Sequence, residues 1–172
     1  DPSNLQRIPA DRVDRVRYLT SQLQNNASSL NADLVFLHEG IKAADLSGSD
    51  LLFIHVPSSS YSRDEVAAIT DFLKKGGSLF LAMDADYWTT LEQANVNDII
   101  RPFGIQYGSD SPDTQVGGLT RKGLITRQAL KIPYHGGRIV NGGTPFSFGN
   151  GPEPVSFGAF AEPDDGGKII VM

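Results

Sequence analysis

The fold is decided by residues 50–57, DLLFIHVP, together with SRDE at 62–65 and KKGGSLFLA at 74–82. This order predicts a strand, a loop, a helix and a second strand, which is one βαβ unit. Both apolar runs are short, rich in branched and aromatic residues, and free of polar alternation, which is typical of strands buried on both faces of a parallel sheet. A right-handed crossover brings the loops after both strands to one sheet edge, where open α/β folds usually bind ligands.

Composition sets broad limits on the protein. A chain of 172 residues with 40% hydrophobic and 20% charged residues is typical of one globular domain. Its apolar runs are too short for a membrane span, and a net charge of −5 without a basic stripe argues against nucleic acid as a partner. The absence of cysteine excludes disulfides and thiolate nucleophiles.

Three helices are expected along the chain. Apolar residues at helical spacing predict an amphipathic helix over residues 9–25 and another over about 88–101. The middle helix follows Ser62, whose hydroxyl forms a capping box with Glu65, and it ends at Gly76, which supplies a left-handed stop.

Strands are expected on both sides of these helices. Besides the two strands of the βαβ unit, residues 34–37 match a short buried strand, and the glycine-rich tract 105–165 reads as short strands joined by tight turns. We therefore expect a single α/β domain, residues 1–172. It consists of a core (1–104), a loop-rich β extension (105–165) and a returning core strand (166–172), and its ends suggest a piece of a larger protein.

Several segments resemble the class I glutamine amidotransferase-like superfamily. They are DLLFI at 50–54, the capping box with FLKKGGSL at 72–79, VNDIIRPFGI at 96–105 and GKIIV at 167–171. The similarity is greatest to its non-catalytic accessory-domain branch, found in bacterial surface and carbohydrate-processing proteins and in gliding-motility or ciliary transport proteins. The resemblance implies a flavodoxin-like or amidotransferase-like three-layer sandwich with a mostly parallel central sheet.

The chain departs from the active members of that superfamily at the nucleophile. They carry a Gly-x-Cys-x-Gly elbow after a central strand, whereas here the strand 78–82 leads into MDAD at 83–86. Because the chain has no cysteine, glutaminase chemistry by that mechanism is excluded.

Five residues at predicted strand ends are candidates for catalysis, namely His38, Glu39, His55, Asp84 and Asp86. Imidazole and carboxylate groups could bind a divalent metal or act as general acid and base. No metal-spaced motif accompanies them, so the favoured interpretation gives them structural roles as caps and loop bonds, and predicts no metal and no cofactor.

A second set is predicted to bind a ligand: Ser58, Ser59, Tyr61, Asp86, Tyr87, Trp88 and His135. The serines lie in the loop after the first strand of the βαβ unit but lack a Gly-x-Ser-x-Gly pattern. Tyr87 and Trp88 could offer an aromatic platform to a sugar ring or a partner side chain, and His135 stands between glycines.

The favoured function is a non-catalytic ligand- or protein-interaction module of a larger bacterial protein, with carbohydrate as the candidate ligand and an exported or periplasmic location as the candidate compartment. The expected partners are neighbouring domains of the same polypeptide or another protein. The alternative is a hydrolase or metal-dependent enzyme that acts on a carbohydrate or amide through the five candidate residues. A purely architectural domain is the third interpretation.

Overall fold

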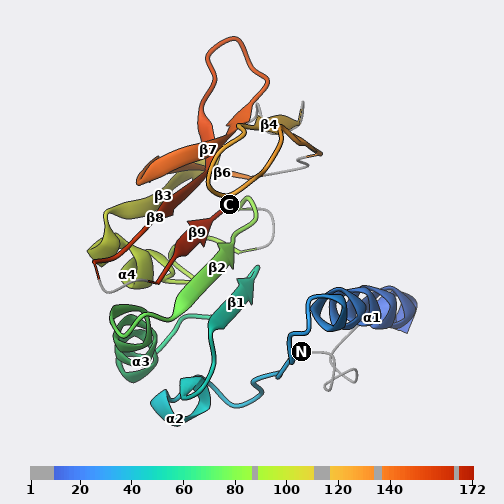
Figure 1. Cartoon of the computed structure of the whole chain (residues 1–172), viewed down its shortest axis with the longest axis vertical. Coiled ribbons are helices and arrows are strands. Elements are labelled where there is room, and N and C mark those ends of the chain that lie inside the picture. The colour runs from blue at the N-terminus through green and yellow to red at the C-terminus, as the bar shows by residue number, and fades with distance from the viewer. Residues whose placement is uncertain (1–9, 87–88, 111–116, 134–136, 165–166) are drawn as a thin grey trace. The chain divides into compact units, whose positions relative to one another are not determined.

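A computed structural model describes residues 10–86, 89–110, 117–133, 137–164 and 167–172. The chain divides into two compact units, Asp1–Gly40 and Ile41–Met172. Figure 1 shows the course of the chain. The two units are described separately below, and the single-domain organisation expected from the sequence stays a prediction.

The first unit contains one long helix. A short 3-10 helix, η2 (Ala10–Arg12), leads into α1 (Val13–Ser29), which confirms the helix expected there and extends it by four residues. Asn31 ends it with a φ of 53°, and the Ala32 amide donates to the Ala27 carbonyl at 2.9 Å, as in a Schellman cap. The strand expected over residues 34–37 is absent, because this segment pairs with no strand in the described part of the chain.

The second unit is built on two sheets. The larger sheet has seven strands in the order β1-β2-β9-β8-β7-β4-β5, and the smaller pairs β3 with β6. In chain order the strands are β1 (Leu51–His55), β2 (Ser78–Ala82), β3 (Ile105–Asp110), β4 (Gly118–Thr120), β5 (Lys131–Ile132), β6 (Arg138–Gly142), β7 (Thr144–Gly149), β8 (Ser156–Ala161) and β9 (Ile169–Val171).

The βαβ unit forms as the sequence predicts. β1 and β2 are parallel, with Phe53 opposite Phe80, and α3 (Arg63–Lys74) connects them. The capping box is present, since the Glu65 amide donates to the Ser62 hydroxyl at 3.2 Å and the Ser62 amide donates to the Glu65 carboxylate at 2.8 Å. Gly76 follows α3 with a φ of 95°. A short helix, α2 (Ala43–Leu46), precedes β1.

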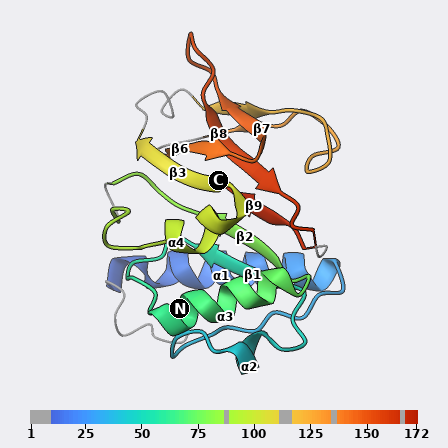
Figure 2. The ribbon, with the colours of Figure 1, turned by 90° about the vertical axis from the view of Figure 1, so that its left-hand side faces the viewer.

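The predicted fold class is wrong. A three-layer sandwich requires a mostly parallel sheet between helical layers, but only the β1–β2 and β2–β9 pairs are parallel, and the four remaining pairs of the large sheet are antiparallel. The tract 105–165 is not a separate β extension of the core, because four of its strands belong to the same seven-stranded sheet as β1 and β2 (Figure 2). The result is a mixed sheet with few helices.

The third expected helix is also much shorter than predicted. Between residues 88 and 101 the described chain is helical only in α4 (Asn97–Ile100), which continues into the 3-10 helix η3 (Arg101–Phe103). Gly104 ends it with a left-handed φ of 75°. Val96, Ile99 and Ile100 are nevertheless fully buried, so the apolar pattern reports burial rather than a long helix.

The two strands of the βαβ unit differ in burial. Burial alternates in both strands: in β2, Leu79 and Leu81 are fully buried and the other residues half-buried, whereas in β1, Leu52 and Ile54 are buried and the other residues exposed. The expectation that both faces of β1 are buried is therefore wrong. β1 is the edge strand of the seven-stranded sheet, and its Phe53 ring stacks on Phe80 with 5.3 Å between ring centroids.

Candidate functional site

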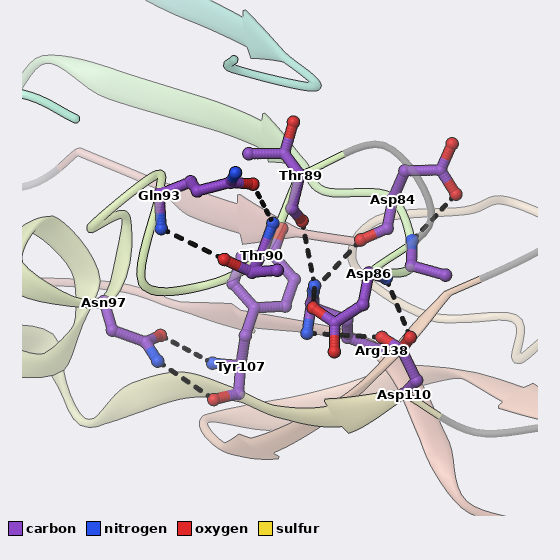
Figure 3. A network of polar contacts seen from close by, with 10 residues as sticks. Asp84, Asp86, Thr89, Thr90, Gln93, Asn97, Tyr107, Asp110 and Arg138 are labelled. Atoms are coloured by element: carbon purple, nitrogen blue, oxygen red, sulfur yellow. Dashed lines mark hydrogen bonds and ion pairs between the residues drawn. The ribbon is translucent and has the colours of Figure 1, made fainter. Parts of the chain in front are cut away.

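A cluster of polar side chains lies where β2 ends, close to the smaller sheet (Figure 3). At its centre is Arg138, the first residue of β6, whose side chain is only 2% exposed. The loop after β2 brings Asp84 and Asp86 to the guanidinium, and Asp110 reaches it from the end of β3.

The guanidinium is bound on every side by groups of this chain. Arg138 Nε donates to the Asp84 carbonyl at 3.0 Å, and Nη2 donates to the Asp86 carboxylate and to the Thr89 carbonyl, the latter at 3.0 Å. Nη1 lies 3.2 Å from Asp110 Oδ1 in an ion pair. The Asp86 amide closes the ring by donating to Asp110 Oδ2 at 2.7 Å.

This arrangement gives the cluster a structural task. A buried guanidinium is costly unless its charge is balanced and its donors are bonded. Here two carboxylates balance the charge, and Asp86, the Asp84 carbonyl and the Thr89 carbonyl accept hydrogen bonds, whereas Asp110 Oδ1 contributes through the ion pair alone. Since Arg138 and Asp110 belong to the small sheet and the other acceptors to the loop after β2, the cluster joins the small sheet to the carboxyl end of β2. Asp86 and Asp110 are thus both paired with Arg138, while the Asp86 side chain stays half exposed.

A second polar contact ties the same elements together. The buried Tyr107 hydroxyl from β3 lies 2.8 Å from the Leu81 carbonyl and 2.9 Å from the Met172 carbonyl. Asn97 binds the Tyr107 backbone on both sides, donating to its carbonyl at 3.0 Å and accepting from its amide at 2.8 Å. The Asn97 side-chain amide thus makes the two backbone hydrogen bonds that a neighbouring strand would otherwise make.

Sequence reasoning identifies two aspartates of this cluster, Asp84 and Asp86, but neither Arg138 nor Asp110. Both are predicted above as candidate catalytic residues, and the structure shows their loop held by Arg138. The signal that could have found Arg138 is an arginine directly before the apolar pair Ile139-Val140 in a predicted strand. A charged side chain entering a buried strand requires a counter-charge, and the MDAD segment offered two.

The other candidate catalytic residues are placed as follows. His38 and Glu39 are exposed and belong to the first unit, whereas His55 is exposed at the end of β1 and stacks on Phe53 with centroids 6.2 Å apart. The Asp84 carboxylate accepts from the Ala85 amide at 2.8 Å. Among the residues that the structure describes, no group of three or more metal-ligating side chains gathers. A joint action of all five residues stays a prediction.

The predicted ligand-binding residues lie partly in the loop after β1. Ser58 and Ser59 are exposed there, and Tyr61 is half-buried. Burial, with the nearby Glu65 carboxylate, raises the pKa of the Tyr61 hydroxyl to about 12, so it stays protonated at neutral pH. The Tyr61 backbone is held by Asn95, which accepts from its amide at 2.7 Å. Tyr87, Trp88 and His135 lie outside the described residues.

The start of this loop is strained. Val56 has a φ of +44°, a left-handed conformation that β-branched residues rarely adopt. Its amide still donates to the carbonyl of Ala82 in β2 at 2.8 Å, so the chain turns directly after the end of β1.

Both the sequence and the fold of this chain are similar to those of known proteins. A family model described as the IFT52 GIFT domain matches residues 15–115, more than half of the chain. A solved structure, the "mmIFT52 N-terminal domain", matches with a TM-score of 0.73 and 18% identity over 89% of this chain and 77% of that one. At this identity, the match supports the fold alone. No curated protein matches the sequence.

These matches correct the sequence-based assignment. The resemblance to the glutamine amidotransferase-like superfamily is wrong as a family assignment, and so is the function of a bacterial, carbohydrate-related module, because the matching family is one of intraflagellar transport domains. The expectation of a partner protein is consistent with this family, whereas no finding supports the expected carbohydrate ligand.

In the described part of the chain no helix is both long and apolar enough to cross a membrane. By the match over residues 15–115, the chain belongs to the IFT52 GIFT domain family.

Proposed function

We propose that this chain is a protein-interaction domain of an intraflagellar transport complex. Its membership of the IFT52 GIFT domain family supports the context of the proposal. The structural observation that carries it is the buried Arg138 cluster, in which the acids nearest the carboxyl end of β2 hold the fold together.

The polar groups at this sheet edge serve the scaffold. Asp86 and Asp110 neutralise Arg138, and the Tyr107 hydroxyl bonds to the carbonyls of two neighbouring strands. A rigid scaffold of this kind suits a domain that presents surface loops to other proteins, since loops placed on a rigid frame often carry binding residues. Ser58, Ser59 and Tyr61, in the loop after β1, are proposed as part of such a surface.

Co-purification tests this proposal. The full-length protein that carries this chain is tagged, expressed in ciliated cells and purified, and the proteins bound to it are quantified by mass spectrometry. We expect intraflagellar transport proteins to be enriched with the native sequence. Arg138→Met, which removes the buried charge, should reduce that enrichment in proportion to the loss of folded domain.

The matched control is Arg101→Met, which removes an exposed arginine from η3. It should retain the partners of the native protein. The proposal fails if the native protein enriches no transport proteins. It also fails if Arg138→Met unfolds the domain, as measured by proteolysis, while every transport partner remains bound.

A further inference from the structure

The charges of this chain are unevenly distributed. Residues 114–152 contain no Asp or Glu but hold five Lys and Arg residues. The rest of the chain holds all 20 acidic residues and the ten remaining basic ones, so it is strongly acidic. A chain with a net charge of −5 thus contains one long segment that is purely cationic.

Most of this positive charge is on the hairpin between β4 and β5. Of the five basic residues, Arg138 is buried in its cluster, and the other four are exposed: Arg121, Lys122, Arg127 and Lys131. We call residues 119–131 the basic loop. In Figure 2 it is the gold segment that loops out from the sheet near β7. Within the described chain, no carboxylate pairs with any of these four side chains.

Large apolar side chains are interspersed with the charges. Leu119 and Leu130 are each 41% exposed, and Leu124 is 71% exposed. These leucines leave much of their apolar surface in contact with water, beside cations that no carboxylate of the described chain pairs with. They are the surface that a partner would cover.

The basic loop is ordered by its own hydrogen bonds. The buried Thr120 hydroxyl accepts from the Leu130 amide at 2.8 Å, and the Thr120 amide donates to the Leu130 carbonyl at 2.9 Å. Across the turn, the Thr126 hydroxyl donates to the Arg121 carbonyl at 2.7 Å, and the Gly123 amide donates to the Thr126 carbonyl at 2.8 Å. A loop closed in this way loses little conformational entropy on binding.

The loop is also fixed to the large sheet. The Arg121 amide donates to the Phe146 carbonyl of β7 at 2.7 Å, and the Arg121 guanidinium lies over the Phe148 ring, 4.1 Å from its centroid. This cation–π contact holds one of the four cations in place while its side chain stays exposed.

We propose that the basic loop binds an acidic segment of a partner protein, and that the segment carries apolar side chains which cover Leu119, Leu124 and Leu130. This inference rests on the proposed interaction function and specifies the chemistry of one partner. Carboxylates would pair with the four cations, and the three leucines would supply the apolar contact.

The same features disfavour the other polyanions. A nucleic acid is held mainly by contacts from cations to several phosphates, and the basic loop offers only four exposed cations, on a chain whose net charge is −5. An anionic membrane surface would repel the acidic remainder of the chain in the same way. A peptide segment can place its carboxylates at the loop alone.

Carbodiimide cross-linking of the native complex gives a direct test. This reagent joins a lysine amine to a carboxylate in contact with it, so Lys122 and Lys131 report on acidic partners without a spacer. We expect one or both to be linked to Asp or Glu of a co-purified transport protein. Coupling to no partner carboxylate would overturn the inference.

A charge-reversal pair measures the contribution of the loop. Lys122→Glu with Arg127→Glu leaves the stacked Arg121 in place, and should weaken binding of the cross-linked partner about tenfold or more, because two attractions become repulsions. The control pair, Arg63→Glu with Arg101→Glu, changes the net charge equally at exposed sites elsewhere and should leave binding unchanged.

The outcomes separate the inference from the proposed function. If the reversed protein keeps the partner at native affinity, the basic loop is not the site, although the domain still functions in the complex. If the native protein enriches no transport protein, the proposed function itself fails. Binding of the loop to phosphatidylserine vesicles or to a single-stranded RNA oligonucleotide, with no partner protein cross-linked, would assign it to another class of ligand and overturn the inference.

Discussion

Arg138 shows how much of this domain depends on one side chain. It is 2% exposed, and its charge is balanced by Asp86, which is half exposed, and by Asp110, which is one-third exposed. Solvent screens part of the interaction on the carboxylate side, so the attraction alone contributes modestly. The larger effect is the penalty of leaving one of these groups unpaired after its partner is removed.

We expect Arg138→Met to destabilise the domain by about 3–5 kcal/mol, the usual cost of breaking a buried ion pair by removing one partner. Methionine preserves most of the side-chain volume, so the loss reflects the charge and the hydrogen bonds. Urea unfolding followed by circular dichroism measures the change. Arg101→Met serves as the exposed control and should change stability by no more than about 0.5 kcal/mol.

Val56 offers a test in which a familiar order of stability reverses. At most positions alanine is more stable than glycine, because glycine loses more entropy on folding. At the φ of +44° of Val56, a Cβ atom is strained and glycine is not. We therefore expect Val56→Gly to be more stable than Val56→Ala by about 1 kcal/mol.

The comparison has an internal control at Leu51, which is exposed in β1 and has no positive φ. There the alanine variant should be the more stable of the two. If alanine is also preferred over glycine at position 56 in thermal unfolding, the left-handed conformation of Val56 does not occur in solution.

At the scale of elements, α3 depends on its first turn. The Ser62 hydroxyl and the Glu65 carboxylate each satisfy an amide at the start of the helix, and Glu65 also accepts from the Ile41 amide at 3.1 Å. We expect Ser62→Ala to cost about 1 kcal/mol in urea unfolding. Ser60→Ala, an exposed serine two residues earlier, should cost nothing measurable.

The capping box of Ser62 and Glu65 also makes the stability of the domain depend on pH in the acidic range. The Ser62 backbone amide, followed by the Ser62 side chain, lowers the pKa of Glu65 below its usual 4.5 in the folded state. A lowered pKa means that the stabilisation is complete above the unfolded-state pKa and is lost as the pH falls through the folded-state value. Glu65→Gln should therefore unfold with a weaker pH dependence than the native chain below about pH 5. Equal acid sensitivity of both proteins would contradict this assignment.

The sequence predicts elements whose signals are local. The Ser62 and Glu65 box, Gly76 and the two apolar runs were enough to place α3 between two parallel strands, since each feature acts within a few residues. The apolar run 34–37 looked equally strand-like but found no partner strand. The segment 88–101 has helical spacing, yet only its last turns are helical in the described chain. Periodicity reports which residues are buried, while the choice of helix, strand or loop depends on distant partners.

The candidate site was only partly predictable for the same reason. Asp84 and Asp86 could be selected because they follow a strand directly, but their binding to Arg138 joins residues 54 and 52 positions apart in the sequence. Nothing local in the sequence specifies such a contact. The family assignment is wrong because the segments that suggest it, within the βαβ unit and at 96–105 and 167–171, follow an order of elements that many α/β proteins share.

At the scale of the whole second unit, β9 joins the parallel part of the large sheet to its antiparallel part. It pairs parallel with β2 on one side and antiparallel with β8 on the other, so the parallel and antiparallel parts of the large sheet meet at this strand. Ile169 and Val171 are both fully buried there. The Lys168 carbonyl accepts from the Leu79 amide at 2.8 Å, which aligns β9 with β2 from its first residue.

This position predicts that β1, β2, β7 and β8 unfold together. Ile169→Ala should cost about 2–5 kcal/mol by opening a cavity at the junction, and the loss should be felt on both sides of it. Hydrogen exchange followed by mass spectrometry can measure this, since peptides from β2 and from β8 should lose protection by the same amount. Leu124→Ala, which shortens a side chain that is 71% exposed, should change neither. If only one side of β9 lost protection, the two parts of the sheet would be separate folding units, and β9 would belong to just one of them.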